Sequence, residues 1–408
     1  MTSVNQYRIP SWEFILIAIS TIYFIVPSVQ MMVPFYAFLP IEIFYSFYLL
    51  SKRYIDTSVF AQYVLLIFFI SLLYALLTDP VSIADDISYR TTKRFLSKFM
   101  QYSCMFFPLL FLKRCIMVGT QRQNTRLLGI SVISMLIACQ SILDLIVENS
   151  LAAREFSVEE STKDMEGFVV AYPFVYGMSF VFVLTIFLAI KIRIKNFILK
   201  CIFAILALFF LYFLLKAQFT LALLTSILSI LILLMREIKR LDTFILFLCF
   251  CFPFLIILPE LFRFVITALP EVLSSRFGEV YDFYMGNSMN DDSDLLGRFA
   301  LYEKSIQAFL NSPIWGNRTV DFDGHATYLM VWADLGIIGG IPIFTLLFRS
   351  KRVVSKLLGK LSFYFTPFFI HLFLNGLTNP IHASLQIYIC VWFLIPLSLY
   401  AFSSKIKI

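Results

Sequence analysis

The chain has 408 residues, of which 60% are hydrophobic and only 14% are charged. A water-soluble core cannot bury so much apolar surface, so this composition excludes a soluble globular protein and predicts a membrane protein. The formal net charge of +7 does not indicate nucleic-acid binding, because the sequence contains no soluble basic domain.

Apolar segments long enough to cross about 30 Å of hydrocarbon as α-helices recur along the whole chain. The second and fourth segments are short and interrupted by polar residues, and a re-entrant segment is the alternative interpretation for one of them. The predicted fold is therefore an all-α, polytopic membrane helix bundle with about twelve transmembrane helices. The predicted spans are 13–33, 35–50, 58–78, 99–112, 127–147, 168–190, 199–215, 218–235, 242–259, 326–348, 361–378 and 382–401.

Lysine and arginine collect in alternate loops, as expected for the cytoplasmic loops of an inner-membrane protein. Examples are Arg193 and Lys195 after the sixth span and the basic segment 349–360 after the tenth. This pattern predicts an even number of spans with both termini in the cytoplasm. The heavy use of Phe, Ile and Lys is typical of a multi-pass protein of the bacterial inner (plasma) membrane.

The chain divides into three predicted parts. Residues 1–259 hold the first nine spans, residues 260–325 form a large extracytoplasmic loop, and residues 326–408 hold the last three spans and a cytoplasmic C-terminus. A loop of this length is too long to be a simple connection, and such loops usually carry function.

The second half of this loop predicts an amphipathic helix over 295–310. Asp292 to Asp294 is a helix start signal, and Pro313 follows the predicted end. Apolar residues recur at helical spacing, so that Arg298, Tyr302 and Ser305 share one stripe beside the apolar face. The stripe is either the solvated edge of a helix on the membrane surface or part of a functional site. We interpret the neighbouring acidic residues as a helix cap rather than a metal site, and no metal is predicted.

His325 lies where the tenth span begins, after the acidic residues Asp321 and Asp323. A lone histidine at a helix end is most often an ordinary interfacial residue, but this one has a polar neighbourhood. Asp334 lies within the same span, where an acid is costly. It is half a helical turn out of phase with His325, and we expect it to link helices rather than to act directly with the histidine.

These residues form an ordered block that resembles a known family. The segments Gly297-Arg298, Tyr302, Ser305, 309–316, 324–329 and 333–339 resemble the signature block of bacterial O-antigen and capsular polysaccharide polymerases, which the related O-antigen ligases share. Two departures stand out. Ala326 follows the histidine where ligase-type relatives often have Asn or Ser, and the segment from Lys216 to Thr220 occupies a joint where many relatives place an arginine.

The resemblance implies a membrane glycosyltransferase that uses an undecaprenyl-pyrophosphate-linked oligosaccharide. It would polymerise the repeat units on the extracytoplasmic face and would need no cofactor, because the pyrophosphate bond supplies the driving force. His325 would be the general base, and Arg298 the main cation for the leaving pyrophosphate. The further substrate-binding residues implied are Arg276, Lys216, Tyr302, Arg318 and Gln218.

The expected partners are this lipid-linked oligosaccharide and membrane lipid, with a chain-length regulator and a flippase as further candidates and no nucleic acid. Two other functions stay open. A ligase would transfer the glycan to a lipid A core, and a transporter of polysaccharide or lipid-linked sugar would show an internal repeat, broken central helices and charges near the middle of the bilayer. The sequence shows no such repeat, and nearly all of its charges lie at span ends and in loops.

Overall fold

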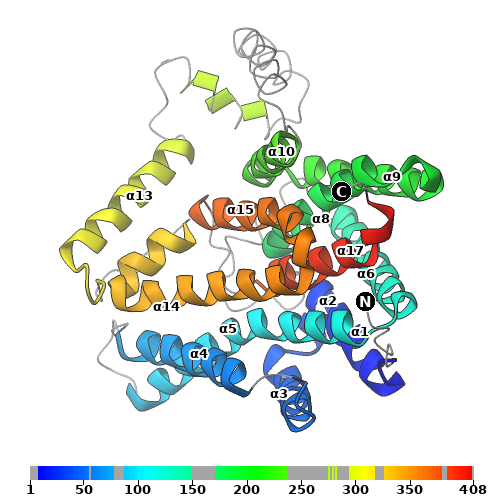
Figure 1. Cartoon of the computed structure of the whole chain (residues 1–408). Helices are drawn as coiled ribbons and strands as arrows, with labels where there is room; N and C mark the ends of the chain where they lie inside the picture. The colour runs from blue at the N-terminus through cyan, green and yellow to red at the C-terminus, as the bar shows by residue number, and fades with distance from the viewer. Residues whose placement is uncertain are drawn as a thin grey trace.

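The computed structural model describes residues 8–54, 57–77, 87–148, 171–236, 274–275, 278–279, 281–282, 294–317, 326–378 and 384–406. Within these ranges the chain is almost entirely helical and forms no β-strand, apart from an isolated bridge between Ile192 and Ile406. Figure 1 shows the arrangement of the helices. The first helices are α1 (Ser11–Ile25), α2 (Pro27–Met32), α3 (Phe35–Ser51), α4 (Thr57–Leu77), α5 (Ile87–Met117), α6 (Gln121–Glu148) and α8 (Ala171–Lys191). They are followed by η2 (Ile194–Asn196), α9 (Phe197–Ala217), α10 (Thr220–Met235), α13 (Asp294–Asn311), α14 (Thr327–Leu358), η3 (Gly359–Leu361), α15 (Ser362–Thr378), α16 (Leu385–Ile389), the π-helix η4 (Cys390–Leu394), α17 (Ile395–Ala401) and η5 (Ser403–Lys405).

Helices cover the predicted spans within the described ranges, although the first span, 13–33, is divided between α1 and α2 at Val26. The ninth span, 242–259, lies outside the described residues. Five helical stretches are long and apolar enough to cross a membrane, and one of these, Thr327–Thr378, contains both α14 and α15. The protein is therefore a helical membrane protein, while the count of twelve spans stays a prediction. The five stretches are Val59–Leu76, Gln121–Leu145, Pro173–Lys191, Ile194–Ala217 and Thr327–Thr378.

The fourth predicted span corresponds to a longer helix than expected, because α5 begins at Ile87 rather than near residue 99. Its polar first turns continue the helix along α4, where Phe95 packs edge-on against Phe68 with ring centroids 5.2 Å apart. The lysine at this level, Lys98, lies over the ring of Tyr74. Packing against α4 thus favours a helical conformation where the apolar run alone did not indicate one.

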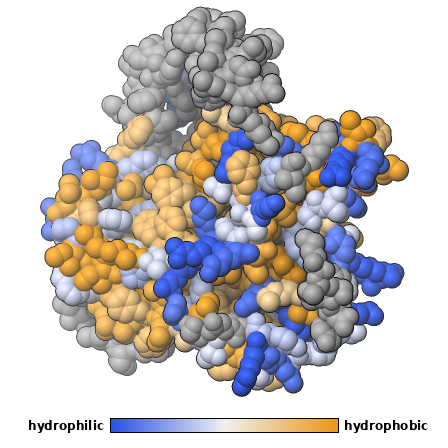
Figure 2. Space-filling model, viewed as in Figure 1, coloured by the Kyte–Doolittle hydropathy of each residue, from blue (hydrophilic) through white to orange (hydrophobic). Residues whose placement is uncertain are grey.

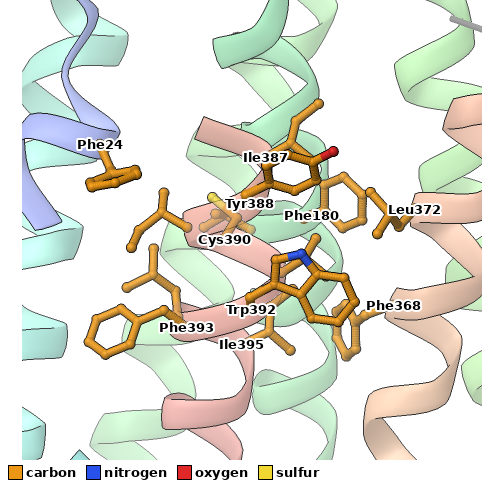
Figure 3. Packing of buried hydrophobic residues seen from close by; sticks show 14 of the residues in the cluster. Phe24, Phe180, Phe368, Leu372, Ile387, Tyr388, Cys390, Trp392, Phe393 and Ile395 are labelled. Atoms are coloured by element: carbon orange, nitrogen blue, oxygen red, sulfur yellow. The ribbon is translucent and has the colours of Figure 1, made fainter. Parts of the chain in front are cut away.

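The last helix, formed by α16, η4 and α17, lies at the centre of the bundle. It packs against α1, α5, α6, α8, α14 and α15. Figure 3 shows side chains of this centre, with Trp392 directed towards Phe368 of α15. Trp392 and Phe393 are completely buried, so this helix has no face left for lipid.

The surface of the bundle is rich in apolar side chains, as Figure 2 shows on one face. Ile198 on α9 is 77% exposed, and Phe44 on α3 is 71% exposed. Contiguous apolar surface of this kind marks contact with a membrane or a partner. These outer helices therefore present the surface that a bilayer would cover.

The two ends of the described chain meet at the same end of the bundle. The backbone N–H of Ile9 donates to Oε1 of Gln123 (3.2 Å), and the N–H of Arg193 donates to the carbonyl of Lys405 (2.9 Å). The Nε2 atom of Gln121, at the start of α6, donates to the carbonyl of Ala401 and joins these two pairs of segments. The beginning of α1, the turn before α6, the end of α8 and the end of the chain therefore lie together. In Figure 1 the two marked termini lie on the right and α13 lies on the left, at the opposite end.

Candidate functional site

Several of the predicted site residues lie outside the described residues. These are His325, Arg276 and Arg318, together with most of the acidic segment before α13. Arg298 belongs to α13, whose bounds Asp294–Asn311 enclose the predicted helix 295–310, but its side chain is not described. On the same helix Ser305 is buried and Tyr302 is half-buried, with the Tyr302 ring edge-on to Phe299 at 6.3 Å.

The two predicted residues at the joint of α9 and α10 have different surroundings. Lys216, in the last turn of α9, is exposed and lies over the Tyr212 ring at 6.0 Å. Gln218 is buried and has a left-handed backbone (φ 59°) that ends α9. Gln218 therefore shapes the turn between two helices, and Lys216 faces outward from it.

The block singled out in the sequence forms one interlocked unit. After α13 the chain turns at Pro313 to Gly316 and hydrogen-bonds to the middle of α14. The N–H of Ile337 donates to the carbonyl of Pro313 (2.9 Å), and that of Ile338 donates to the carbonyl of Ile314 (3.3 Å). In the other direction the N–H of Asn317 donates to the carbonyl of Ala333 (2.6 Å). The turn and the helix thus exchange backbone hydrogen bonds as a pair of strands would.

This exchange is possible because α14 is broken at Gly336. Its backbone (φ 58°, ψ −157°) is far from helical and lies in a region that almost only glycine adopts. The break frees backbone groups of α14, and the turn pairs with three of them, the N–H groups of Ile337 and Ile338 and the carbonyl of Ala333. Gly316, also with positive φ (76°), lies against the Asp334 backbone so closely that a Cβ atom at Gly316 would overlap it. Both glycines are therefore required for this contact.

Next to the break lies a polar cluster that we call the Lys98–Asp334 cluster. It consists of Tyr74 on α4, Lys98 and Tyr102 on α5, Asp334 on α14 and Tyr388 on α16. The Lys98 Nζ atom lies 4.7 Å from the centroid of the Tyr74 ring, and the rings of Tyr74 and Tyr102 are 6.3 Å apart. Asp334 interacts electrostatically with Lys98, Tyr74 and Tyr102. Four helices thus bring one cation, one acid and three phenols together.

The cluster is mostly withdrawn from solvent. The exposed fractions are 3% for Tyr74, 1% for Tyr102 and 4% for Tyr388, whereas Lys98 and Asp334 are half-buried. A half-buried cation and acid at the edge of such a cluster remain accessible to a ligand, while the buried phenols hold their surroundings rigid. Charges in this setting act more strongly than they would in water.

A second polar group lies on α15 and faces α8. The Nε2 atom of His371 lies 3.3 Å from the Ser179 hydroxyl, and the imidazole stacks on Phe180 at 4.2 Å. One turn further along α15, Asn375 is completely buried, and its amide makes no hydrogen bond to the described residues. Tyr328 packs closely on Gly376 beside it. A buried amide without a partner in the described structure is a place where a water molecule or a ligand group fits.

Sequence reasoning missed Lys98 and Tyr102 as site residues, although it singled out Asp334. The available signal was their spacing, because residues four apart share a face of a helix and a lysine at the edge of an apolar run is unusual. Nothing in the sequence predicted that Lys98 and Asp334 interact, since the two residues belong to distant parts of the chain.

The arrangement is suited to bind a polar, anionic ligand at the end of the bundle opposite the termini. Lys98 can attract a phosphate, and phenol and amide groups can hydrogen-bond sugar hydroxyls. Comparison with known proteins adds nothing to this assignment: no protein-family model matches the sequence, and no curated protein matches it either.

Proposed function

We propose that the protein is a membrane glycosyltransferase that polymerises undecaprenyl-pyrophosphate-linked oligosaccharide repeat units. In this proposal it works on the extracytoplasmic face of the bacterial inner membrane, with both termini in the cytoplasm. One observation carries the proposal: the block that resembles the polymerases folds as the interlocked α13–α14 unit, and this unit abuts the Lys98–Asp334 cluster. The unit also lies opposite the termini, on the side that the proposed topology makes extracytoplasmic.

The proposed reaction joins two lipid-linked glycans. The acceptor hydroxyl oxygen attacks the anomeric carbon of the donor sugar, and the bond from that carbon to the phosphate oxygen breaks. The electron pair leaves with the lipid pyrophosphate, and the hydroxyl proton passes to His325. His325 directly precedes Ala326, which is buried and caps α14, so the start of α14 fixes the backbone next to it.

Cations would stabilise the leaving pyrophosphate as its charge grows. Arg298 is assigned the main role, with Arg276 and Arg318 in support. Lys98 now joins this set, because it is half-buried and interacts electrostatically with Asp334 at the same end of the bundle. Tyr302 lies on α13 near this end, whereas the exposed position of Lys216 suits it to an approaching headgroup rather than to the cluster. Gln218, buried in the turn between α9 and α10, would then position that segment.

One observation favours transport as a second candidate function. Transporters often have broken helices with a charge near the break, and α14 is broken at Gly336, two residues after Asp334. In transporters the freed backbone lines a cavity for the cargo. Here the freed backbone of α14 instead forms hydrogen bonds with the turn from Pro313 to Asn317. The break therefore stabilises the fold rather than lining a cavity, and polymerisation remains the preferred function.

The test uses protein reconstituted in vesicles with a lipid-linked repeat unit as substrate. Wild-type protein should give a ladder of glycan lengths on a gel. His325→Ala should reach the membrane in normal amount but leave single repeats, with a rate about 10²–10⁴-fold lower, and His382→Ala should retain the ladder. Transfer of a single repeat to lipid A core would identify a ligase instead. Movement of the substrate across the vesicle without a new bond would identify a transporter.

Lys98 can be tested with a closely matched control. Lys351 lies over the ring of Phe369 at 4.7 Å, the same distance as Lys98 over Tyr74, but on the cytoplasmic half of α14 in the proposed topology. Lys98→Met should raise the KM for the lipid-linked substrate, whereas Lys351→Met should not. Equal effects of the two substitutions would show that Lys98 only contributes to packing.

A further inference from the structure

A cleft lies between the ends of α3 and α5, far from the Lys98–Asp334 cluster. Its volume is about 120 Å³, and it is open to the outside. Its lining residues are Leu49, Arg53 and Tyr54 from the end of α3, and Leu110, Lys113, Arg114, Met117 and Val118 from α5. One wall is thus apolar, and three cations lie around it.

Arg114 is the buried member of this set, with 4% of its surface exposed. Its Nε and Nη2 atoms donate to the two carboxylate oxygens of Glu13 at 2.5 and 2.9 Å, and its guanidinium lies over the Tyr54 ring at 3.8 Å. These contacts fix the guanidinium plane. The Nη1 atom is buried and has no hydrogen-bond acceptor among the described residues. One edge of a rigidly held arginine is therefore left to bind an additional acceptor.

The charges around the cleft favour an anion. Among the described residues, the three cations Arg53, Lys113 and Arg114 lie near one acid, Glu13, which is already paired with Arg114. The C-terminal ends of α3 and α5 carry partial negative charge and act in the opposite direction. At α3 this effect is reduced, because the N–H groups of Arg53 and Tyr54 cap the carbonyls of Leu50 and Leu49 (both 2.9 Å). The positive charge of the three cations therefore outweighs the partial negative charge of the helix ends.

The position of the cleft suits a lipid. It lies at the ends of the second and fourth predicted spans, on the side of the termini, where Gly119 after α5 approaches Ile9. The outer face of α3 next to it is apolar and exposed, with Phe44 at 71% and Phe47 at 60%. Basic pockets between helices at a membrane surface are typical sites for anionic lipid headgroups, whose acyl chains then lie along the neighbouring helix.

We propose that the cleft between α3 and α5 binds a phosphate group, supplied by an anionic phospholipid of the leaflet at the termini. The phosphate would accept from Nη1 of Arg114, and Arg53 and Lys113 would hold its remaining oxygens. The apolar wall and the outer face of α3 would contact the acyl chains. This site is independent of the proposed polymerase activity.

The test measures lipid retained by purified full-length protein, using native mass spectrometry after incubation with phosphatidylglycerol or phosphatidylcholine. The test variant is Arg53→Gln with Lys113→Gln, which leaves the Glu13–Arg114 pair intact. The control is Arg193→Gln with Lys195→Gln, which removes an arginine and a lysine that are exposed at the same end of the bundle but lie outside the cleft. Wild-type and control protein should prefer phosphatidylglycerol. The test variant should bind it about 30-fold more weakly, since each cation near an anionic surface contributes about fivefold.

Adding inorganic phosphate shows whether the phosphate group in the cleft belongs to a lipid or is a free phosphate ion. If millimolar phosphate displaces phosphatidylglycerol and phosphatidylcholine is bound equally well, the cleft takes free phosphate and the assignment to a lipid is wrong. If the test variant retains phosphatidylglycerol as the control does, the cleft binds neither. The proposal holds if phosphatidylglycerol is preferred, resists phosphate and is lost only from the test variant.

Discussion

Replacing Gly336 by alanine tests the contact between the turn at 313–317 and the break in α14. A Cβ atom there would lie 2.5 Å from the Ile314 carbonyl oxygen and 2.6 Å from the Gly316 nitrogen. Alanine is also strained at this backbone conformation, by about 1–3 kcal/mol. The alternative is a straightened α14, which would give up three hydrogen bonds to the turn, each contributing about 0.5–1.5 kcal/mol, and regain some within the helix. We expect the free energy of unfolding to fall by roughly 2–4 kcal/mol, whether α14 keeps its break or straightens.

The loss can be measured as a melting temperature in detergent with a thiol-reactive fluorophore. Cys115, Cys139 and Cys390 are buried free thiols that react only when the bundle opens. Gly336→Ala should melt roughly 4 °C or more below wild type, at about 2 °C per kcal/mol.

Gly129→Ala is the matched control for this measurement. Gly129 lies within α6, and a Cβ atom added there would meet no atom within 4 Å. This variant should melt at or slightly above the wild-type temperature, because alanine favours a helix by about 0.5–1 kcal/mol over glycine. Equal melting temperatures of the Gly336→Ala and Gly129→Ala variants would refute the role assigned to the break.

Two further predictions concern the buried ion pair and the topology. Glu13→Gln should destabilise the protein by about 3–5 kcal/mol, because Arg114 would keep a buried charge without its partner, and combining it with Arg114→Met should restore part of the loss in the same melting assay. An unchanged melting curve for Glu13→Gln would contradict the buried pair. Reporters fused after Lys195 or Lys356 should read as cytoplasmic, and those after Asp164 or Asn290 as extracytoplasmic; two reversed readings would rule out the proposed orientation.

Hydropathy and helical spacing were sufficient to predict where most of the described helices lie. An apolar run in a bilayer has to satisfy its backbone hydrogen bonds internally, so hydropathy alone indicates a helix. The amphipathic spacing over 295–310 likewise indicated the helix found as α13. Hydropathy was less reliable for α5, whose first turns are polar and are held by α4.

The break in α14 and the composition of the candidate site depend on contacts between distant parts of the chain. Gly336 lies inside an apolar run that favours a continuous helix, and its positive φ depends on backbone partners supplied by a turn elsewhere in the chain. The same holds for Lys98 with Asp334 and for Arg114 with Glu13. Hydropathy is a property of consecutive residues, whereas the pairing of polar groups depends on which helices pack together.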